Sequence, residues 1–333
     1  MPANLTPMYL KAEEAYRKAK TIDEKIAALE DMLALIPKHK GTDKMQADIK
    51  RRLSQARAEK QRRGKSGGQR KDPFHVPPSG GGQVALMGLP NVGKTSLVNA
   101  LAGTDLKVAD YPFTTQVPAP GMAKFEDAPF QLLDMPPVTE DGAPGGMIGA
   151  LRRADILLLV LDLGREDLLE QLEVLEGILE RRGIVPVPWG CSRAREAELE
   201  VGFAKSALIV ATKRDLDGGG NVEVLEELYE GDLEIVPVSV QEGEVLERLK
   251  ERLYRMLDVI RVYSKQPGKK ADMEEPFLIP KGSTIGQLAE LIHKELPKQM
   301  KFARVWGPSA KFDGQQLQQN HVLMDRDIVE IHV

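Results

Sequence analysis

Between residues 83 and 257 the chain alternates short apolar runs with amphipathic segments. The apolar runs that predict buried strands are QVALMG (83–88), FQLLD (130–134), DILLLVLD (155–162), SALIVATK (206–213) and LEIVPVS (233–239). Helical patterns follow at 94–103, 167–182, 221–230 and 242–257. Strands that alternate with helices favour a mostly parallel sheet with helices on both faces, which is an α/β fold.

The two ends of the chain have different patterns. Apolar residues recur every three or four positions from Ile22 to Ile36 and again from Met45 to Ala56, which predicts an antiparallel helical hairpin. The segment YLKAEEAYRKAK (9–20) predicts an earlier helix. From residue 277 onward we expect a strand, a helix over Thr284–Leu296, and strands at FARVWG (302–307) and DIVEIHV (327–333). The expected regions are 1–72, 73–265 and 266–333.

Composition limits the class of protein. The chain has 333 residues, a net charge of −4 and 42% hydrophobic residues, so it should be globular with more than one domain. Its one cysteine, Cys191, cannot form an intrachain disulfide, which suits a reducing compartment. No signal pattern precedes the first helix, and the longest apolar run is too short to span a membrane. We therefore expect a cytoplasmic protein that does not span a membrane.

Positive charge is concentrated before the central region. Thirteen Lys and Arg residues lie between Lys38 and Asp72 against four acids, and the tail KQRRGKSGGQRK (Lys60–Lys71) mixes basic residues with glycine. One interpretation is a solvated helix face with a linker; the other is a contact with RNA phosphates. Trp306 also has two interpretations, either as a core residue of a small β module or as a platform on which a base stacks.

The strongest chemical signal lies between the first strand and the first helix of the central region. Gly88, four residues and then Gly93-Lys94-Thr95 is the P-loop spacing. Its glycines let successive N–H groups point at phosphates, Lys94 should reach the β- and γ-phosphates, and the Thr95 hydroxyl should bind Mg²⁺. The residues expected to hold the phosphates are Gly88, Asn91, Val92, Gly93, Lys94, Thr95 and Ser96.

Three further segments follow in the order that a GTPase needs. DYPFTTQ (Asp110–Gln116) should offer a threonine to Mg²⁺ and the γ-phosphate, and Asp134 should hold Mg²⁺ through water. Asp215 can accept two hydrogen bonds from guanine that adenine cannot donate, which disfavours an ATPase. Lys213 should lie along the base, and the base-binding residues expected are Thr212, Lys213, Asp215, Ser239 and Val240.

The segments GLPNVGKTSLVNALAG, ADYPFTTQVPAPG and LLDMPP resemble the Obg and developmentally regulated GTP-binding protein group of GTPases. Residues Phe277–Val333 are similar to a TGS domain, a small β-grasp module. The resemblance implies that Thr115 is the switch threonine, with Thr114 as second choice, so that Lys94, Thr115 and Asp134 form the catalytic set. It also implies Mg²⁺, RNA or ribosome binding through the basic arm and TGS domain, and an accessory protein. At Asn91 the alternatives are a potassium ligand and a residue that only shapes the turn.

The sequence departs from that group at several positions. The interval from Asp162 to Lys205 is too short for the family's inserted domain, and Thr212 replaces the usual asparagine. The motif DxxG ends in Pro137, which has no N–H to donate to the γ-phosphate, and Val138 stands where Ras-like proteins have a catalytic glutamine. We predict a GTP/GDP switch with slow hydrolysis. The alternative is a non-hydrolysing binding module that nucleotide stabilises.

Overall fold

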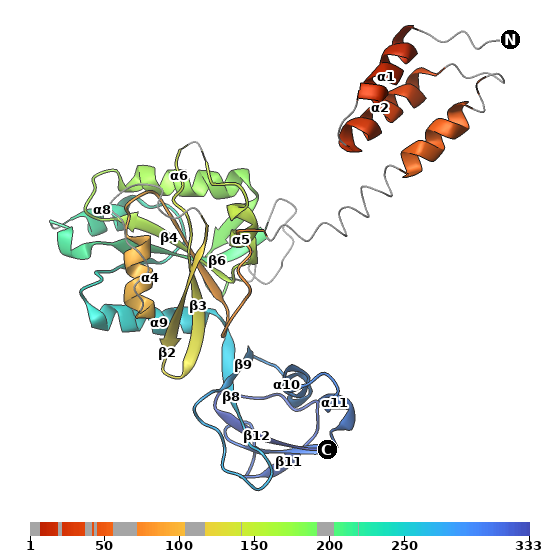
Figure 1. Cartoon of the computed structure of the whole chain (residues 1–333). Helices are drawn as coiled ribbons and strands as arrows, with labels where there is room; N and C mark the ends of the chain where they lie inside the picture. Colours follow the sequence, from red (N-terminus) through yellow and green to blue (C-terminus); the bar gives the residue numbers. More distant parts are fainter. Residues whose placement is uncertain are drawn as a thin grey trace. The chain divides into compact units, whose positions relative to one another are not determined.

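The computed structural model describes residues 7–18, 22–36, 42, 45–55, 72–103, 117–140, 142–191, 203–218 and 220–333 (Figure 1). Packing divides the chain into two units, residues 1–72 and 73–333. The basic tail Lys60–Lys71 and the segment Asp110–Gln116 lie outside the described residues, so the predictions made for them stay predictions. Within the described residues, no helix is long and apolar enough to cross a membrane.

The N-terminal unit contains helices α1 (Pro7–Lys18) and α2 (Ile22–Leu35) and a helical segment at 45–55. All three contribute to one small core, which contains Tyr9, Ala12, Leu29, Met32, Ile36, Ile49 and Leu53. The earlier helix predicted at 9–20 is therefore present and shares a core with the two segments predicted to form the hairpin. The first helix joins the same core because Tyr9 and Ala12 lie on one helical face and are buried there.

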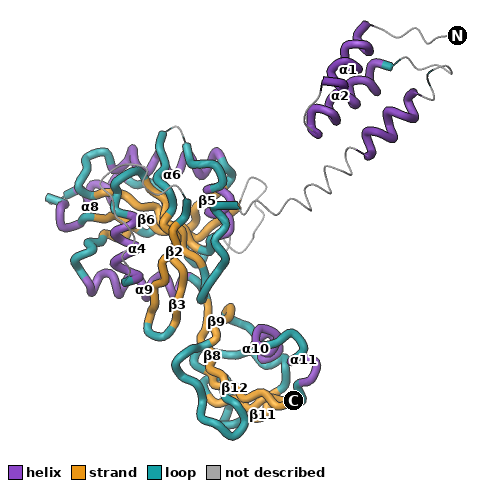
Figure 2. The backbone as a smooth tube through the Cα atoms, viewed as in Figure 1, coloured by secondary structure: helices purple, strands orange, loops and turns teal. Residues whose placement is uncertain are grey.

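The second unit begins with an α/β domain (Figures 1 and 2). Its strands are β1 (Gln83–Gly88), β2 (Ala119–Phe125), β3 (Ala128–Asp134), β4 (Ile156–Asp162), β5 (Ile184–Val187), β6 (Phe203–Thr212) and β7 (Ile235–Pro237). Its helices are α4 (Lys94–Ala102), α5 (Met147–Arg153), α6 (Leu168–Arg181), η1 (Arg214–Leu216), α8 (Asn221–Leu228) and α9 (Gly243–Met256). The strand order is β2-β3-β1-β4-β6-β5, with β7 also paired to β6, and only the β2–β3 pair is antiparallel.

Helices cover both faces of this sheet. Val84 and Leu86 of β1 pack with α4 and α9, whereas the alternate residues Ala85 and Met87 pack with α5, α6 and α8. This division follows from the strand geometry, because successive side chains point to opposite faces. The buried parallel strands β1, β4 and β6 end at one edge of the sheet, where ligands of such folds bind.

The strands and helices predicted for the central region are confirmed, but β2, β5 and α5 were missed. In β2 the residues Pro120 and Gly121 hide the strand pattern; both are tolerated because β2 is an edge strand. Helix α5 was missed because it is short and begins directly after Gly145 and Gly146, which disfavour a helical pattern.

The C-terminal part forms a second sheet with the order β11-β10-β12-β8-β9. Its elements are β8 (Val259–Ser264), β9 (Phe277–Pro280), α10 (Ile285–Ile292), α11 (Leu296–Gln299), β10 (Phe302–Trp306), β11 (Gln315–Leu317) and β12 (Asp327–His332). The sheet includes β8, so it starts earlier than the expected limit at residue 266. The predicted helix Thr284–Leu296 starts with a Thr284 capping box but breaks after Ile292, because Pro297 has no N–H to continue the helical ladder.

The β2–β3 turn joins the two sheets through a buried arginine. The Arg261 side chain of β8 is 6% exposed and forms ion pairs with Glu126, Asp127 and Asp325. The Asp127 contact measures 3.0 Å and the Asp325 contact 2.6 Å. The Tyr263 hydroxyl donates a second hydrogen bond to Asp127. The turn that links β2 to β3 is therefore fixed to the second sheet by contacts between a buried arginine and carboxylates that are partly open to water.

Candidate functional site

The loop between β1 and α4 is sharply bent. Gly88 lies so close to β4 that a Cβ atom there would be 2.6 Å from the Val160 carbonyl oxygen. Asn91 and Gly93 have φ angles of 63° and 88°, in the left-handed region. Gly93 is also the N-cap of α4, so the N–H groups of Lys94, Thr95 and Ser96 lie in the helix's first turn. A bend of this kind at a helix N-terminus can bind a phosphate through backbone N–H groups.

The Lys94 ammonium lies under this loop. Its Nζ donates hydrogen bonds to the carbonyl oxygens of Gly88 at 3.0 Å and Leu89 at 2.8 Å. Burial lowers the pKa of Lys94 to about 8, and the nearby Asp134 carboxylate opposes that shift. A bound anion such as a phosphate would stabilise the charged ammonium, because a nearby negative charge favours the protonated lysine and offsets the effect of burial.

Thr95 and Asp134 lie together beside Lys94. The Thr95 hydroxyl donates to Asp134 Oδ2 at 2.6 Å, and the Asp134 side chain is buried at the end of β3. Burial raises the pKa of Asp134, while the Thr95 hydrogen bond and the Lys94 charge act against the shift. Among the described residues, Asp134 Oδ1 is the one buried side-chain oxygen or nitrogen without a hydrogen-bond partner.

This pair fits a magnesium ion bound together with a nucleotide. Mg²⁺ takes oxygen ligands and commonly keeps several waters, with one or two protein ligands and the substrate phosphates. The Thr95 hydroxyl could bind the ion directly, and the free Asp134 Oδ1 could accept a hydrogen bond from one of its waters. In the described part of the chain, no group of three or more His, Cys, Asp or Glu side chains could hold a metal alone.

On the other side of the loop, Thr212 connects three elements. It ends β6 and is buried, and its Oγ1 lies 2.6 Å from the Val92 carbonyl oxygen and 2.9 Å from that of Leu161. The hydroxyl can therefore hold the phosphate loop against the end of β4. Thr212 reaches both carbonyl oxygens, although the family that the chain resembles usually has asparagine at this position.

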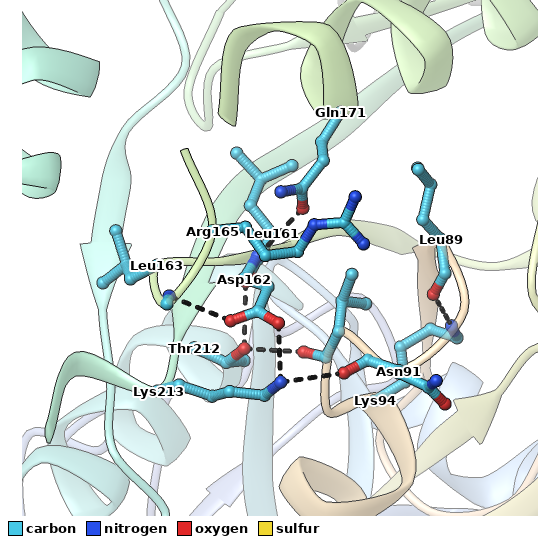
Figure 3. A network of polar contacts seen from close by, with 12 residues as sticks. Leu89, Asn91, Lys94, Leu161, Asp162, Leu163, Arg165, Gln171, Thr212 and Lys213 are labelled. Carbon is cyan, nitrogen blue, oxygen red and sulfur yellow. Dashed lines mark hydrogen bonds and ion pairs between the residues drawn. The ribbon is translucent and has the colours of Figure 1, made fainter. Parts of the chain in front are cut away.

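The Lys213 side chain crosses below the same loop (Figure 3). Its Nζ forms an ion pair with Asp162 Oδ2 at 2.6 Å and donates to the Asn91 carbonyl oxygen at 3.0 Å. Lys213 itself has a φ angle of 61°, so its backbone turns sharply as β6 ends. The lysine stem is thereby fixed in place between β6 and the loop.

Asp162 is a member of the site that sequence analysis missed. Its Oδ1 accepts a hydrogen bond from the Gly164 N–H at 3.0 Å, and its own N–H donates to Gln171 Oε1 at 3.0 Å (Figure 3). These contacts fix the carboxylate that binds Lys213. The available signal was its position at the end of an apolar strand, but no motif identified it.

Asp215 and Ser239 also lie together. The Ser239 hydroxyl donates to Asp215 Oδ1 at 2.7 Å and accepts from the Gln241 N–H at 3.3 Å. Ser239 is buried, whereas Asp215 and Val240 are exposed. The Asp215 carboxylate is therefore open, as a surface that a base can cover.

The segment after Asp134 is bonded to the loop through Val138. The Val138 N–H donates to the Gly88 carbonyl oxygen at 3.2 Å, and its side chain is fully buried. Thr139 and Gly142 then exchange backbone hydrogen bonds of 3.1 and 2.9 Å. The backbone N–H groups of Val138, Thr139 and Gly142 therefore already donate to carbonyl oxygens of the protein.

The structure thus brings the expected phosphate, magnesium and base residues together at the strand ends. Thr115 and Thr114 lie outside the described residues, so their position relative to Lys94 and Asp134 stays a prediction. Trp306, for which a core position and a base platform were the alternatives, is partly exposed.

Comparison with known proteins agrees with this geometry. A model for the 50S ribosome-binding GTPase family matches residues 83–187, and one for the TGS domain matches 260–333. A GTP-binding protein of Methanocaldococcus jannaschii is 30% identical over 93% of this chain and 92% of its own length. One from Halobacterium salinarum is 29% identical over 93% and 98%. Developmentally-regulated GTP-binding protein 1 of Xenopus laevis is 28% identical over 92% and 98%.

The fold, the site and these matches define a P-loop GTPase joined to a TGS domain. The chain belongs to the Obg and developmentally regulated GTP-binding protein family, and it is a GTP-binding GTPase of that family.

Proposed function

We propose that this GTPase is a GTP/GDP switch with slow intrinsic hydrolysis that acts on RNA or the ribosome. The observation that carries its magnesium-nucleotide chemistry is the unpaired, buried Asp134 Oδ1 beside the Thr95 hydroxyl and the Lys94 ammonium. In this proposal Lys94 binds the β- and γ-phosphates and Thr95 binds Mg²⁺. The loop N–H groups hold the remaining phosphate oxygens, and their residues are Asn91, Val92, Gly93, Lys94, Thr95 and Ser96.

The base side of the proposed site selects guanine. Asp215 accepts hydrogen bonds from the guanine N1–H and N2 amino group, and Ser239 holds that carboxylate through its hydroxyl. The Val240 backbone N–H donates to the guanine O6, and the Lys213 stem lies along the ring. Thr212 positions the loop rather than the base, because its hydroxyl faces the Val92 and Leu161 carbonyl groups.

Hydrolysis is proposed to be slow because two groups are missing after Asp134. Pro137 has no N–H for the γ-phosphate, and the side chain of Val138 is buried and apolar, so it cannot orient a water. Catalysis then depends on Lys94, Mg²⁺ and Thr115. A potassium ion near Asn91 would add positive charge where negative charge develops, which supports a cation-dependent rate.

The basic arm and the TGS domain are proposed to contact RNA in the cytoplasm. The arm contributes charge from residues 38–72, and phosphate contacts of this kind make affinity fall steeply with salt. The second candidate function is a non-hydrolysing module that nucleotide stabilises. It is favoured by the same two residues, Pro137 and Val138.

One experiment separates these functions. GTP turnover is measured with and without ribosomes, in potassium and in sodium buffer. The proposal predicts slow turnover alone, faster turnover with ribosomes, and a higher rate in potassium that Asn91→Ala abolishes. No turnover under any of these conditions, with guanine nucleotide still bound, would instead support the non-hydrolysing module.

A further inference from the structure

The β2–β3 hairpin connects the nucleotide site to the second sheet. Its open end carries Asp134, which ends β3, and Ala119, which begins β2. Its closed end is the turn at Glu126 and Asp127, whose carboxylates form ion pairs with Arg261 of β8 (Figure 1). A single hairpin therefore reaches from the proposed magnesium residue Asp134 to the TGS domain.

Both ends of the hairpin belong to one unbroken ladder. Its seven residue pairs run from the pair of Ala119 and Asp134 to the turn. The alternation of buried Ala123 and exposed Lys124 fixes the register, because a slip by one residue would move the buried face of β2 into water. A change in the position of the turn is therefore transmitted along the hairpin to Asp134.

The two neighbours of Asp134 in the sheet have unequal support. On one side its partner is Leu86 of β1, a strand that is itself paired with β4. On the other side its partner is Ala119 of β2, the edge strand, which among the described strands pairs with β3 alone. The β2 side of Asp134 therefore depends most on what holds the hairpin in place.

Arg261 offers the turn a guanidinium that its own domain already holds. The Asp325 carboxylate accepts hydrogen bonds from Nε at 3.1 Å and from Nη2 at 2.6 Å. The third nitrogen, Nη1, donates to Asp127 at 3.0 Å and also to Glu126. Because the guanidinium is planar and rigid, fixing two of its nitrogens sets the position of the third. The contact with the turn is therefore defined in geometry as well as in charge.

The backbone at Glu126 would suit glycine better than glutamate. Its φ angle is 53°, in the left-handed region that hairpin turns of two residues usually fill with glycine or asparagine. The glutamate carboxylate, however, pairs with Arg261, and its Oε2 lies 2.7 Å from Nη2 of Arg326. The side chain and not the backbone therefore explains this residue, which indicates that the turn is built for its contact with the second sheet.

We propose that Arg261 is a positioning residue for the magnesium side of the nucleotide site. It fixes the closed end of the hairpin, and the hairpin holds Asp134 beside the Thr95 hydroxyl, which donates to it at 2.6 Å. This role rests on the magnesium function proposed above for Thr95 and Asp134. The residues that hold phosphate and base follow β1, β6 and β7, so they do not depend on the hairpin. Loss of the Arg261 contacts should therefore weaken Mg²⁺ binding and leave Mg²⁺-free nucleotide binding unchanged.

The contacts can be broken from the turn without leaving a buried charge unpaired. The double variant Glu126→Gln/Asp127→Asn removes both carboxylates, and Arg261 keeps its ion pair with Asp325. This variant should fold, whereas Arg261→Gln leaves three carboxylates without their cation. Where Arg261→Gln also folds, it should have the same effect, and the triple variant no larger one, because all three changes break a single set of contacts.

A matched control separates the hairpin from the stability of the TGS domain. Lys265→Gln breaks an ion pair with the buried Glu330, and both residues belong to the TGS domain. This substitution should lower the thermal stability of the chain, but it leaves the contacts between Arg261 and the turn intact.

The test follows the release of a fluorescent, non-hydrolysable GTP analogue from the full chain as the Mg²⁺ concentration rises. Release is slower with Mg²⁺ where protein oxygens and phosphates share the ion. In the turn double variant, the Mg²⁺ concentration for half-maximal slowing should rise by about fivefold or more. Its release rate in EDTA should equal that of the unmodified protein, and Lys265→Gln should match the unmodified protein in both conditions.

The outcomes separate the role of Arg261 from the proposed function. If Mg²⁺ slows release equally in the unmodified protein and in the turn double variant, Arg261 has no positioning role and the magnesium site stands. An equal rise in Lys265→Gln also overturns that role, because the effect would then come from the stability of the TGS domain. If Mg²⁺ does not slow release from the unmodified protein, both the magnesium site and the role of Arg261 are rejected. The analogue is not hydrolysed, so slow or absent turnover does not affect these results.

Discussion

The two sides of the nucleotide site differ in how their polar groups are held by the rest of the protein. On the base side, side chains already hold one another: Lys213 is paired with Asp162, and Ser239 with Asp215. On the γ-phosphate side, Pro137 has no N–H, and the next N–H, from Val138, is bonded to Gly88. Affinity for guanine nucleotide should therefore come from preorganised contacts, while discrimination between GTP and GDP lacks one of its usual contacts.

The largest expected loss of nucleotide affinity comes from a substitution in the phosphate loop, which lies between the base side and the γ-phosphate side. Lys94→Ala removes the ammonium that we propose to bind the β- and γ-phosphates, and each charge-assisted hydrogen bond contributes about 1.5–3 kcal/mol. Affinity for GTP and GDP should fall about a hundredfold or more, measured by titration calorimetry. The exposed Lys124→Ala is the matched control and should bind normally. Normal GDP affinity in Lys94→Ala would show that the phosphates bind elsewhere.

A change of base tests the preorganised side directly. Asp215→Asn reverses the donor pattern, so guanine affinity should fall about ten- to a hundredfold while xanthine nucleotides bind better. Competition between GDP and XDP measures both effects. Equal preference for guanine before and after the substitution would remove Asp215 from the base site.

Asp162 should have a smaller effect because it acts through Lys213. Asp162→Asn keeps the acceptor for the Gly164 N–H but removes the charge that fixes Lys213, so GDP affinity should fall about tenfold. Glu244→Gln, which breaks an exposed pair with Arg248, is the control and should have no effect on binding. If both substitutions leave GDP affinity unchanged, the Lys213 position does not depend on Asp162.

The pH dependence of GDP affinity tests the role of Lys94 in the phosphate loop. Burial lowers the pKa of Lys94 to about 8, and phosphate binding requires the charged form, so affinity is greatest below that pH. Above pH 8, GDP affinity should fall by up to about tenfold per pH unit, with protons taken up on binding. Calorimetry in buffers of different ionisation enthalpy counts those protons at pH 9. Binding at pH 9 without proton uptake would mean that Lys94 keeps its charge in the empty site.

Some residues of the site could be predicted from the sequence because their motif lies within one loop, whereas others depend on partners that are far away in the sequence. Gly88, Lys94 and Thr95 follow from a spacing within one loop, since the backbone bend needs glycine at fixed positions. Asp162 could not be found in this way, because its partner Lys213 lies 51 positions away and only the sheet order β4-β6 brings them together. The same is true of Arg261, whose partner Glu126 lies 135 positions away, across the junction between the sheets.

The fold shows the same contrast. Long apolar runs identified the buried strands β1, β4 and β6, because a parallel strand covered on both faces is apolar throughout. The edge strand β2 was missed since its Pro120 and Gly121 disfavour a strand unless one side has no partner. Likewise, only two residues, Leu257 and Asp258, separate β8 from α9, and only the pairing of β8 with β9 and β12 assigns it to the second sheet.

The central claim concerns Pro137, and the ratio of GTP to GDP affinity tests it most directly. The ratio is measured by calorimetry with Mg²⁺ in the unmodified protein, in Pro137→Gly, and in Pro136→Ala, which loosens the segment without adding an N–H at position 137. We expect weak GTP preference in the unmodified protein, a rise of about ten- to a hundredfold in Pro137→Gly, and little change in Pro136→Ala. A GTP preference in the unmodified protein as strong as that of Pro137→Gly would contradict the claim.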